Sequence, residues 1–340
     1  MALTSLGIVP VILFGAGTGQ LVQARTPWLL AVSFGLFATI AAGTTLFRRR
    51  LFLRGTTQVT AGPETLYFST PSDHEIGLSV VVPTFNEALR LPDYLREIVT
   101  YLRGRGEPFE VVVADDGSTD NTVQVVNELS SSMPEVRIVA NPRNFGKGFA
   151  VRTGIANSYG KRVLFVDADG STPIAELERL EAAMRDGASI AIGSRAIDGP
   201  GISRSTKSHR KIIGRVFHGI VSTLLLPGLK DTQCGFKLFT RAAASATFGR
   251  QNLDGFSFDV ELLFIGRRLG YRIDEVAVSW SDAPGSKVNL VSDAMRMLVD
   301  IFHIVARDLG DRHKPTSEIG SVAFRVDESE LVSPGQKLKK

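Results

Sequence analysis

The sequence predicts an α/β fold with a mostly parallel sheet, preceded by a membrane anchor. From Leu78 onward, short apolar runs of the length of buried strands alternate with longer amphipathic stretches. Such alternation is typical of a parallel sheet that helices cover on both faces. Closer to the amino terminus, residues 27–47 carry no charge, and a run of about 20 apolar residues is long enough to cross a bilayer.

The predicted strands and helices alternate along the chain from residue 78 onward. The strands lie at 78–82, 110–114, 136–140, 162–166 and 189–193, followed by less regular strands at 233–239 and 271–280. The helices lie at 91–102, 121–129, 148–158 and 175–184, then at 212–226, 258–269 and 291–309. The last of these is too charged to span a membrane, although it could lie on a membrane surface. Ligands of such sheets bind beyond the carboxyl ends of the strands, where we expect the site.

The anchor sets the expected location of the chain. Residues 27–47 are followed by four arginines, and positive flanks stay on the cytoplasmic side. A second uncharged run at 2–22 allows one span or a hairpin of two, and both place the remainder in the cytosol. A cleaved signal peptide is disfavoured because no basic segment precedes the apolar run. The alternative is a buried core helix, but the length of the uncharged run and the arginines that follow it argue against that interpretation.

Composition narrows the function classes. The chain of 340 residues accommodates one large or two ordinary domains. We assign an anchor to 1–50, a linker to 51–76, a catalytic domain to 77–310 and a polar, disordered tail to 311–340. The net charge of +4 and the lack of a basic-aromatic motif argue against nucleic acid. The single cysteine, Cys234, excludes an internal disulfide and is expected to be a packed core residue.

Acidic and amide side chains stand at the exits of the first two strands. Pro83, Asn86 and Glu87 follow the first strand, and Asp115 and Asp116 end the second. A carboxylate there can hold a ribose hydroxyl or a base N–H, as in dinucleotide folds. The alternative is that these residues only cap the next helix. No GxGxxG follows the first strand, which argues against a nicotinamide or flavin.

The fourth strand ends in a D-x-D pair, Asp167 and Asp169. Alternate residues of an extended segment point the same way, so both carboxylates can face one cation. Carboxylate oxygens suit Mg²⁺ or Mn²⁺, which bridge to phosphates and would neutralise a diphosphate leaving group. Most such pairs are instead caps or solvated, but the position at a central strand's exit favours a metal site.

Basic residues crowd the segment after the fifth strand. They are Arg195, Arg204, Lys207, Arg210, Lys211 and Arg215. Guanidinium groups bind phosphate through two hydrogen bonds, whereas a solvated face is the ordinary alternative. Lys287, in a Gly-Ser-Lys turn, would add a phosphate ligand if the fold brings it close.

Together these segments resemble a known family. From about Leu78 to Leu309 the chain resembles the dolichyl-phosphate β-glucosyltransferases, which are inverting family 2 glycosyltransferases with the GT-A fold. The matching stretches are VVVPTFNEALRLP, ADDGSTDNT, NFGKGFAVRTG, DADGST, GSR, DTQCGFKLFTRAAA, FSFDVELL and EVAVSW followed by GSK. An amino-terminal anchor also occurs in that branch, but the apolar runs and the tail lie outside the resemblance.

The resemblance implies roles for particular residues. The expected nucleotide site comprises Pro83, Phe85, Asn86, Glu87, Asp115, Asp116, Lys147 and Asp167, with Asp116 in support. Asp167 and Asp169 are expected to bind the metal, and Arg195 and Arg210 the acceptor phosphate, with Lys287 on a closing segment. Two positions depart from the related mannosyltransferases: Ser171 replaces a metal-binding Gln, and Gly214 replaces an assisting Ser.

The expected reaction is transfer of glucose from UDP-glucose to a polyprenyl or dolichyl phosphate, with inversion, at the cytoplasmic membrane face. An ionised phosphate needs positioning more than deprotonation, so no strong base is required. GDP-mannose or another UDP-sugar remains an alternative donor. A sugar hydroxyl of a surface polysaccharide is an alternative acceptor. Asp259 and Glu261 could serve as a base for such a hydroxyl, or could organise the site. A third possibility is an inactive, membrane-tethered module that only binds nucleotide sugars.

Overall fold

The computed structural model describes residues 76–205, 219, 221–281 and 290–311. Within these ranges, no helix is both long and apolar enough to cross a membrane. Three predicted segments lie outside the described residues: the anchor at 1–50, the linker up to residue 75 and the tail from residue 312. The same holds for five of the predicted basic residues, Lys207, Arg210, Lys211, Arg215 and Lys287. The anchor and the tail therefore remain predictions.

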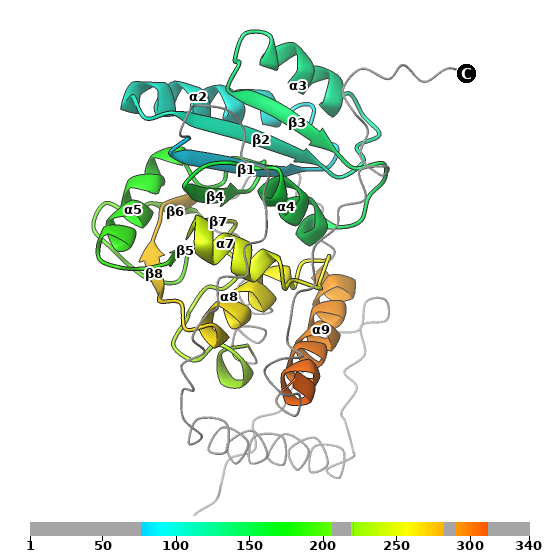
Figure 1. Ribbon diagram of the computed structural model, residues 1–340, viewed down its shortest axis with the longest axis vertical. Helices are drawn as coiled ribbons and strands as arrows, with labels where there is room; N and C mark the ends of the chain where they lie inside the picture. Colours follow the sequence, from blue (N-terminus) through cyan, green and yellow to red (C-terminus); the bar gives the residue numbers. More distant parts are fainter. Residues whose placement is uncertain (1–75, 206–218, 220, 282–289, 312–340) are drawn as a thin grey trace, which may run out of the picture. The chain divides into compact units, whose positions relative to one another are not determined.

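The described residues form one large sheet with the strand order β3-β2-β1-β4-β7-β5-β8 (Figure 1). Its strands are β1 (Leu78–Thr84), β2 (Phe109–Asp115), β3 (Val136–Ala140), β4 (Arg162–Val166), β5 (Ile190–Ser194), β7 (Phe236–Thr240) and β8 (Ile273–Ala277). Strand β7 runs antiparallel to both of its neighbours, β4 and β5, and the other pairs are parallel. A small second sheet pairs β6 (Arg204–Ser205) with β9 (Trp280–Ser281).

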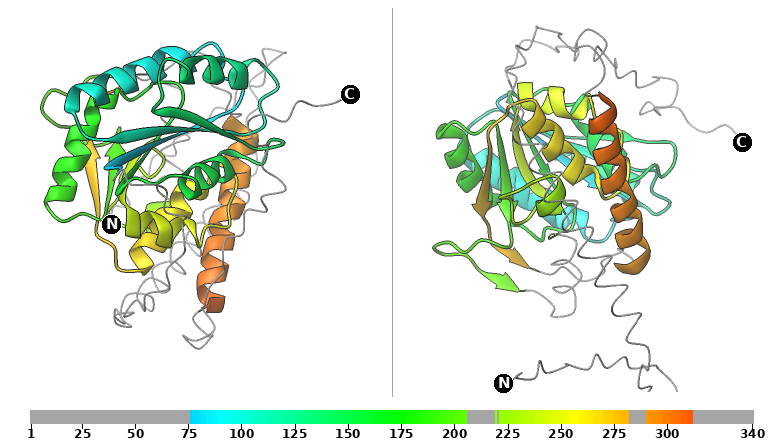
Figure 2. Two further views of the ribbon diagram at one scale, coloured as in Figure 1. Left: turned by 45° about the horizontal axis from the view of Figure 1, so that its top comes forward. Right: turned by 90° about the horizontal axis from the view of Figure 1, so that it is seen from below.

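Helices cover both faces of the large sheet (Figure 2). One face packs against α2 (Leu91–Arg105), α3 (Thr122–Ser130) and α5 (Leu177–Arg185), which follows the short 3₁₀ helix η1 (Ile174–Glu176). The other packs against α4 (Lys147–Ala156), α7 (Arg241–Phe248), α8 (Phe258–Arg268) and α9 (Leu290–Asp311). The predicted layers are thereby confirmed.

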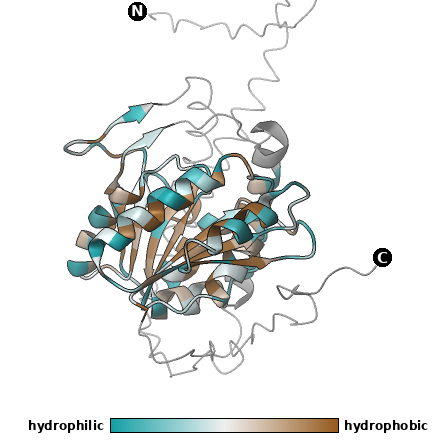
Figure 3. Ribbon diagram, turned by 90° about the horizontal axis from the view of Figure 1, so that it is seen from above, coloured by the Kyte–Doolittle hydropathy of each residue, from teal (hydrophilic) through white to brown (hydrophobic). Residues whose placement is uncertain are grey.

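The sheet divides the apolar core into two clusters because successive strand residues point to opposite faces. In β1, Val80 and Val82 belong to the cluster beneath α2, whereas Val81 belongs to the cluster beneath α4. Strands buried on both faces read as continuous apolar runs, which is why the sequence marked them clearly. Figure 3 shows these apolar strands between helices whose outer surfaces are more polar.

Two of the later predictions differ from the structure. The strand predicted at 271–280 is split into β8 and β9, and the strand predicted at 233–239 begins only at Phe236. Residues 231–235 form a loop instead, whose polar groups bind neighbouring segments. Of the helix predicted at 212–226, residues 219 and 221–224 are helical, whereas residues 212–218 and 220 lie outside the described ranges.

The reversed direction of β7 decides which loops share the functional edge. The register pairs Val166, the last residue of β4, with Phe236, the first residue of β7. The segment that leads into β7 therefore lies beside the segment that leaves β4. This places the loop 231–235 next to Asp167, whose amide donates to the Gly235 carbonyl, a proximity that a wholly parallel sheet would not produce.

Candidate active site

Asn86 ties together the loops that leave β1 and β2. Its backbone φ is 56°, a left-handed conformation that Asn tolerates better than most residues. Its side-chain Oδ1 accepts a hydrogen bond from the Thr119 amide at 2.8 Å, and its own amide donates to Ser118 Oγ at 2.8 Å. Asp115, at the end of β2, accepts from the Ser118 amide at 2.9 Å. The two loops of the expected nucleotide site are thus fixed to one another.

Asp116 supports the loop that precedes Lys147. Its carboxylate accepts hydrogen bonds from the Gly146 amide at 2.7 Å, the Phe145 amide at 3.1 Å and Asn141 Nδ2 at 3.0 Å. Burial raises the pKa of Asp116, and these hydrogen bonds oppose that rise. The residue is 2% exposed, and its role in supporting the nucleotide site stays a prediction.

Glu87 is held by a cation that the sequence did not single out. The Arg90 guanidinium binds the Glu87 carboxylate through Nε at 2.8 Å and Nη2 at 2.7 Å. The hydrogen bond to Glu87 raises the pKa of Arg90 above its usual value, and the charge of Asp169 adds to the rise. Arg90 therefore places positive charge near the D-x-D pair. Pro83 is buried at the end of β1, and Phe85 is half-buried just beyond it.

Asp167 and Lys147 form an ion pair at the exit of β4. Lys147 Nζ lies 2.7 Å from Asp167 Oδ1, and the side chains are 23% and 34% exposed. The Lys147 ammonium also lies 5.4 Å from the centre of the Phe165 ring. Burial lowers the pKa of Lys147, but Asp167 and Asp259 outweigh it and leave the pKa raised. The lysine is therefore an ammonium at neutral pH.

Asp169 lies two residues after Asp167, in the turn that follows β4. Its Oδ1 accepts a hydrogen bond from the Ser171 amide at 3.0 Å, which fixes the turn after β4. Both aspartates raise the pKa of Lys147 and of the buried Tyr94, whose pKa is raised chiefly by burial. Both carboxylates thus lie in the segment that leaves β4.

The oxygen donors of this pair suit a hydrated divalent cation. In the part of the chain that the structure describes, no three His, Cys, Asp or Glu side chains form a metal cluster. Mg²⁺ is usually held by one or two carboxylates and takes its remaining ligands from water and substrate phosphates. Asp167 and Asp169 therefore fit a metal that binds together with a diphosphate.

Gly235 leaves room for the Asp167 carboxylate, and this yields a prediction. The Asp167 amide donates to the Gly235 carbonyl at 2.9 Å, and a Cβ on Gly235 would overlap the carboxylate. We expect Gly235→Ala to displace Asp167 and to lower kcat about 100-fold, a typical cost of a misplaced reacting group. Sugar-transfer kinetics on folded protein measure the effect.

The matched control for that prediction is Gly104→Ala. Gly104 lies in helix α2, and a Cβ there would meet nothing within 4 Å. We expect this variant to keep its kcat and to gain up to about 1 kcal/mol of stability from the higher helix propensity of Ala. Equal kcat values for the two alanine variants would contradict the proposed role of Gly235.

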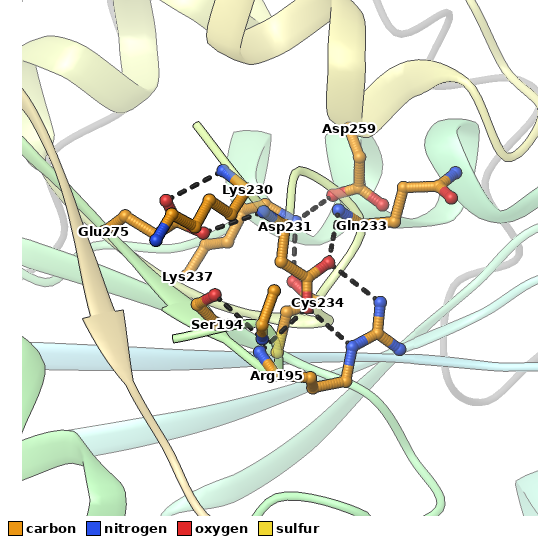
Figure 4. Close-up of polar contacts among 10 residues, drawn as sticks. Ser194, Arg195, Lys230, Asp231, Gln233, Cys234, Lys237, Asp259 and Glu275 are labelled. Carbon is orange, nitrogen blue, oxygen red and sulfur yellow. Dashed lines mark hydrogen bonds and ion pairs between the residues drawn. The ribbon is translucent and has the colours of Figure 1, made fainter. Parts of the chain in front are cut away.

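Arg195 is held by a buried carboxylate (Figure 4). Asp231 accepts from Arg195 Nε at 2.7 Å, from Nη2 at 2.9 Å and from the Arg195 amide at 2.9 Å. Burial alone would raise the pKa of Asp231, but Arg195 holds it below its usual range. The Nη1 edge of the guanidinium is turned away from Asp231, and Trp280 lies 5.5 Å from Arg195. Arg195 follows β5 and Asp167 follows β4, and both strands run antiparallel to β7, so the two residues lie at the same edge of the sheet.

Asp259 and Glu261 are buried rather than presented to a substrate. Asp259 is 3% exposed and binds Lys237 Nζ at 2.5 Å. Glu261 is 4% exposed and accepts from the amides of Asn252 at 2.9 Å and Leu253 at 2.8 Å. Burial raises the pKa of both carboxyl groups, although the partners named here oppose it. The placement favours an organising role for Asp259 over that of a base.

Cys234 is packed as expected, which makes a second prediction. The residue is fully buried, and burial raises the pKa of its thiol to about 12. At pH 8 roughly one thiol in 10,000 would be the reactive thiolate. We expect the native protein to resist a disulfide-exchange reagent and to release one equivalent of chromophore after denaturation. Rapid reaction of the native protein would contradict this.

Sequence reasoning missed Asp231, Lys237 and Arg90 as site residues. Asp231 and Lys237 stand inside the quoted stretch DTQCGFKLF, and a lysine in an apolar strand was the signal that could have marked them. Of the predicted basic residues, Arg195 lies at the site, whereas Arg204, in β6, pairs with Asp198. The roles of Arg210 and Lys287 stay predictions because both lie outside the described residues.

Known proteins are similar to this chain in both sequence and fold. The family described as Glycosyl transferase family 2 matches residues 79–248. A dolichyl-phosphate beta-glucosyltransferase of Dictyostelium discoideum is 37% identical over 260 residues, covering 73% of this chain and 79% of the relative. The human dolichyl-phosphate beta-glucosyltransferase is 39% identical over 246 residues, covering 68% and 76%.

Solved structures show the same fold at low sequence identity. Glucosyl-3-phosphoglycerate synthase of Mycobacterium tuberculosis, solved with Mn²⁺, UDP-glucose and phosphoglyceric acid, has a TM-score of 0.51 and 19% identity, covering 66% of this chain and 78% of that one. Mannosyl-3-phosphoglycerate synthase of Rubrobacter xylanophilus has a TM-score of 0.52 and 17% identity, covering 72% and 78%.

Proposed function

The chain belongs to glycosyl transferase family 2, and from that premise we propose that it transfers glucose from UDP-glucose to a dolichyl-type polyprenyl phosphate. The predicted family resemblance, the GT-A fold and the glycosyltransferase class are confirmed. The names of the relatives support the acceptor and the β-linkage. The choice of UDP-glucose rests on those names and on the UDP-glucose complex of a protein with the same fold.

One observation carries the proposal more than any other. The Asp167–Lys147 pair and the Arg195–Asp231 pair lie at the same edge of the sheet, joined by the segment that precedes β7. The first pair suits a metal-bound diphosphate, and the second presents a guanidinium that suits a phosphate. A donor and an anionic acceptor can therefore meet at this edge.

On the donor side, we assign the nucleotide to the loops that Asn86 and Asp115 fix, beside Glu87 and Phe85. Asp167 and Asp169 would hold Mg²⁺ or Mn²⁺, which supplies positive charge to the diphosphate. Lys147 places its ammonium in the same region and adds to that stabilisation of the leaving group. Asp116 holds the loop before Lys147 and so orients it.

On the acceptor side, we assign the phosphate to Arg195, with Arg210 and Lys287 as further ligands. A phosphate oxygen attacks the anomeric carbon as the bond from that carbon to UDP breaks, and the products are UDP and the β-linked lipid phosphate sugar. An ionised phosphate has no proton to lose, so the chain needs no general base. The bidentate bond to Asp231 fixes the guanidinium and limits the entropy that binding costs.

Membrane attachment suits this acceptor. We propose that residues 1–50 anchor the catalytic domain at the cytoplasmic face, where the phosphate head group leaves the bilayer while the polyprenyl tail stays within it. Because the polyprenyl tail and the anchor would both lie in the bilayer, the enzyme and its acceptor would meet by diffusion in two dimensions. This would raise the effective concentration of the acceptor.

A donor screen tests the function. Purified full-length protein in detergent would receive dolichyl phosphate, Mn²⁺ or Mg²⁺, and labelled UDP-glucose, UDP-galactose, UDP-GlcNAc or GDP-mannose. We expect chloroform-soluble label from UDP-glucose alone, released by mild acid because the product is a glycosyl phosphate. Label that enters the lipid from another donor would correct the sugar. Acid-stable product on a sugar hydroxyl would favour polysaccharide synthesis.

A further inference from the structure

We propose that Lys237 and Asp259 are positioning residues that set the conformation of the segment 231–235, and through it the geometry of both halves of the site. The inference rests on the proposed function. The segment 231–235 lies between Asp167, assigned to the donor, and Arg195, assigned to the acceptor. Neither Lys237 nor Asp259 would touch a substrate.

Lys237 is an unusual residue for its place. It lies in β7, a central strand of the sheet, between the buried Phe236 and Leu238, and it is 0% exposed. Its ammonium donates to Asp259 Oδ1 at 2.5 Å and to the Cys234 carbonyl at 2.6 Å. A buried ion pair contributes little net stability, because desolvation offsets its attraction. We therefore expect the Lys237–Asp259 pair to act through the geometry that it imposes on its neighbours.

The segment 231–235 is fixed at both ends to groups of the site. At its start, Asp231 binds the Arg195 side chain and amide, as Figure 4 shows. At its end, the Gly235 carbonyl accepts from the Asp167 amide at 2.9 Å. The bond from Lys237 to Cys234 holds the peptide between these ends. A shift of that peptide would move Asp167 and Arg195 relative to each other.

A second anchor makes the start of the segment rigid. Glu275, in β8, accepts from the Asp231 amide at 2.7 Å and from the Lys230 amide at 2.8 Å. Glu275 holds the start of the segment. Farther along, Lys237 holds the Cys234 peptide, and Asp259 in α8 pairs with Lys237. The pair thus links α8 to the loop that joins donor and acceptor.

The double variant Lys237→Met with Asp259→Leu tests the inference. It replaces the ion pair by apolar groups of similar size, so we expect it to fold, since such replacements are often neutral. We expect kcat to fall about 100-fold because the reacting groups lose alignment. The affinity for uridine, which lacks the diphosphate, should stay within about threefold by calorimetry because the loops of Asn86 and Asp115 are untouched.

Glu181→Gln is the matched control. Glu181 is also 4% exposed and ion-paired, to Arg105 at 2.6 Å and to Arg162 at 2.5 Å, but Arg162 begins β4 at the opposite edge of the sheet. We expect this variant to lose stability and to keep its kcat. A kcat within threefold of wild type in the double variant, or an equal loss in Glu181→Gln, would overturn the inference.

Two further measurements keep the inference testable if the double variant does not fold or if wild type transfers no sugar to the lipid. If the double variant does not fold, Asp259→Asn decides, because it keeps an oxygen but removes the charge. We expect a kcat loss of about tenfold, and a loss no larger than that of Glu181→Gln would overturn the inference.

If wild type transfers no sugar to the lipid, the proposed function fails, but the reaction of Cys234 with a thiol reagent still tests the positioning. The thiol should react at least about tenfold faster in the double variant or in Asp259→Asn, and an unchanged rate would refute the role of the pair.

Discussion

Replacing Asp167 with Asn is expected to lower kcat at least about 1000-fold, which corresponds to roughly 4 kcal/mol of transition-state stabilisation. The change removes one of the two carboxylates assigned to the cation and leaves Lys147 without its partner at 2.7 Å. The side chain is 34% exposed, so its loss should leave the fold intact. Transfer of labelled sugar to lipid measures kcat, and thermal unfolding checks the fold. Asp169→Ala should act in the same direction.

The control for this experiment is Asp93→Asn. Asp93 lies in the first turn of α2, is 89% exposed and pairs with Arg96 at the surface. Exposed ion pairs contribute at most about 1 kcal/mol, so we expect its kcat to equal that of wild type. Near-normal turnover by Asp167→Asn would remove the basis of the metal assignment.

Replacing Lys147 with Met is expected to change the binding of nucleotide and metal in opposite directions. With the ammonium gone, the diphosphate loses a cation, and we expect the affinity for UDP to fall about 10-fold to 100-fold, or 1.4 to 2.7 kcal/mol. The same ammonium repels a divalent cation that approaches Asp167. The affinity of the nucleotide-free protein for Mn²⁺ should therefore rise, because like charges a few ångströms apart repel.

Calorimetry with UDP, and electron spin resonance of free Mn²⁺ without nucleotide, measure the two affinities. Lys161→Met serves as the control because Lys161 is exposed just before β4, at the edge opposite the site. We expect both of its affinities to match those of wild type. A fall in both affinities of Lys147→Met would indicate a general disturbance of the site and would refute the charge argument.

Much of the candidate site could be placed from the sequence alone because it stands at strand exits. The strands predicted at 136–140 and 162–166 have the observed bounds, and Asp115, Asp167 and Asp169 lie at the ends of strands as expected. A strand buried on both faces leaves a continuous apolar run, so its last residue can be located to within one or two positions. The carboxyl edge then follows from the α/β pattern.

The partners of these residues could not be placed in the same way. Local periodicity reports which face a residue occupies, but not which distant segment lies beside it. Arg195 and Asp231 are 36 positions apart, and Lys237 and Asp259 are 22 positions apart. The sequence therefore left open whether Asp259 is a base or organises the site, and the fold, which buries it against a lysine, favours the second role.

The sequence by itself determined the α/β class, the strand exits and the residues whose chemistry suits a nucleotide, a cation and a phosphate. The tertiary structure decided which of them meet. The decisive element is β7, whose antiparallel course between β4 and β5 brings the segment 231–235 to the edge that holds Asp167. Strand direction depends on packing and pairing across the whole sheet, which no local pattern of apolar residues encodes.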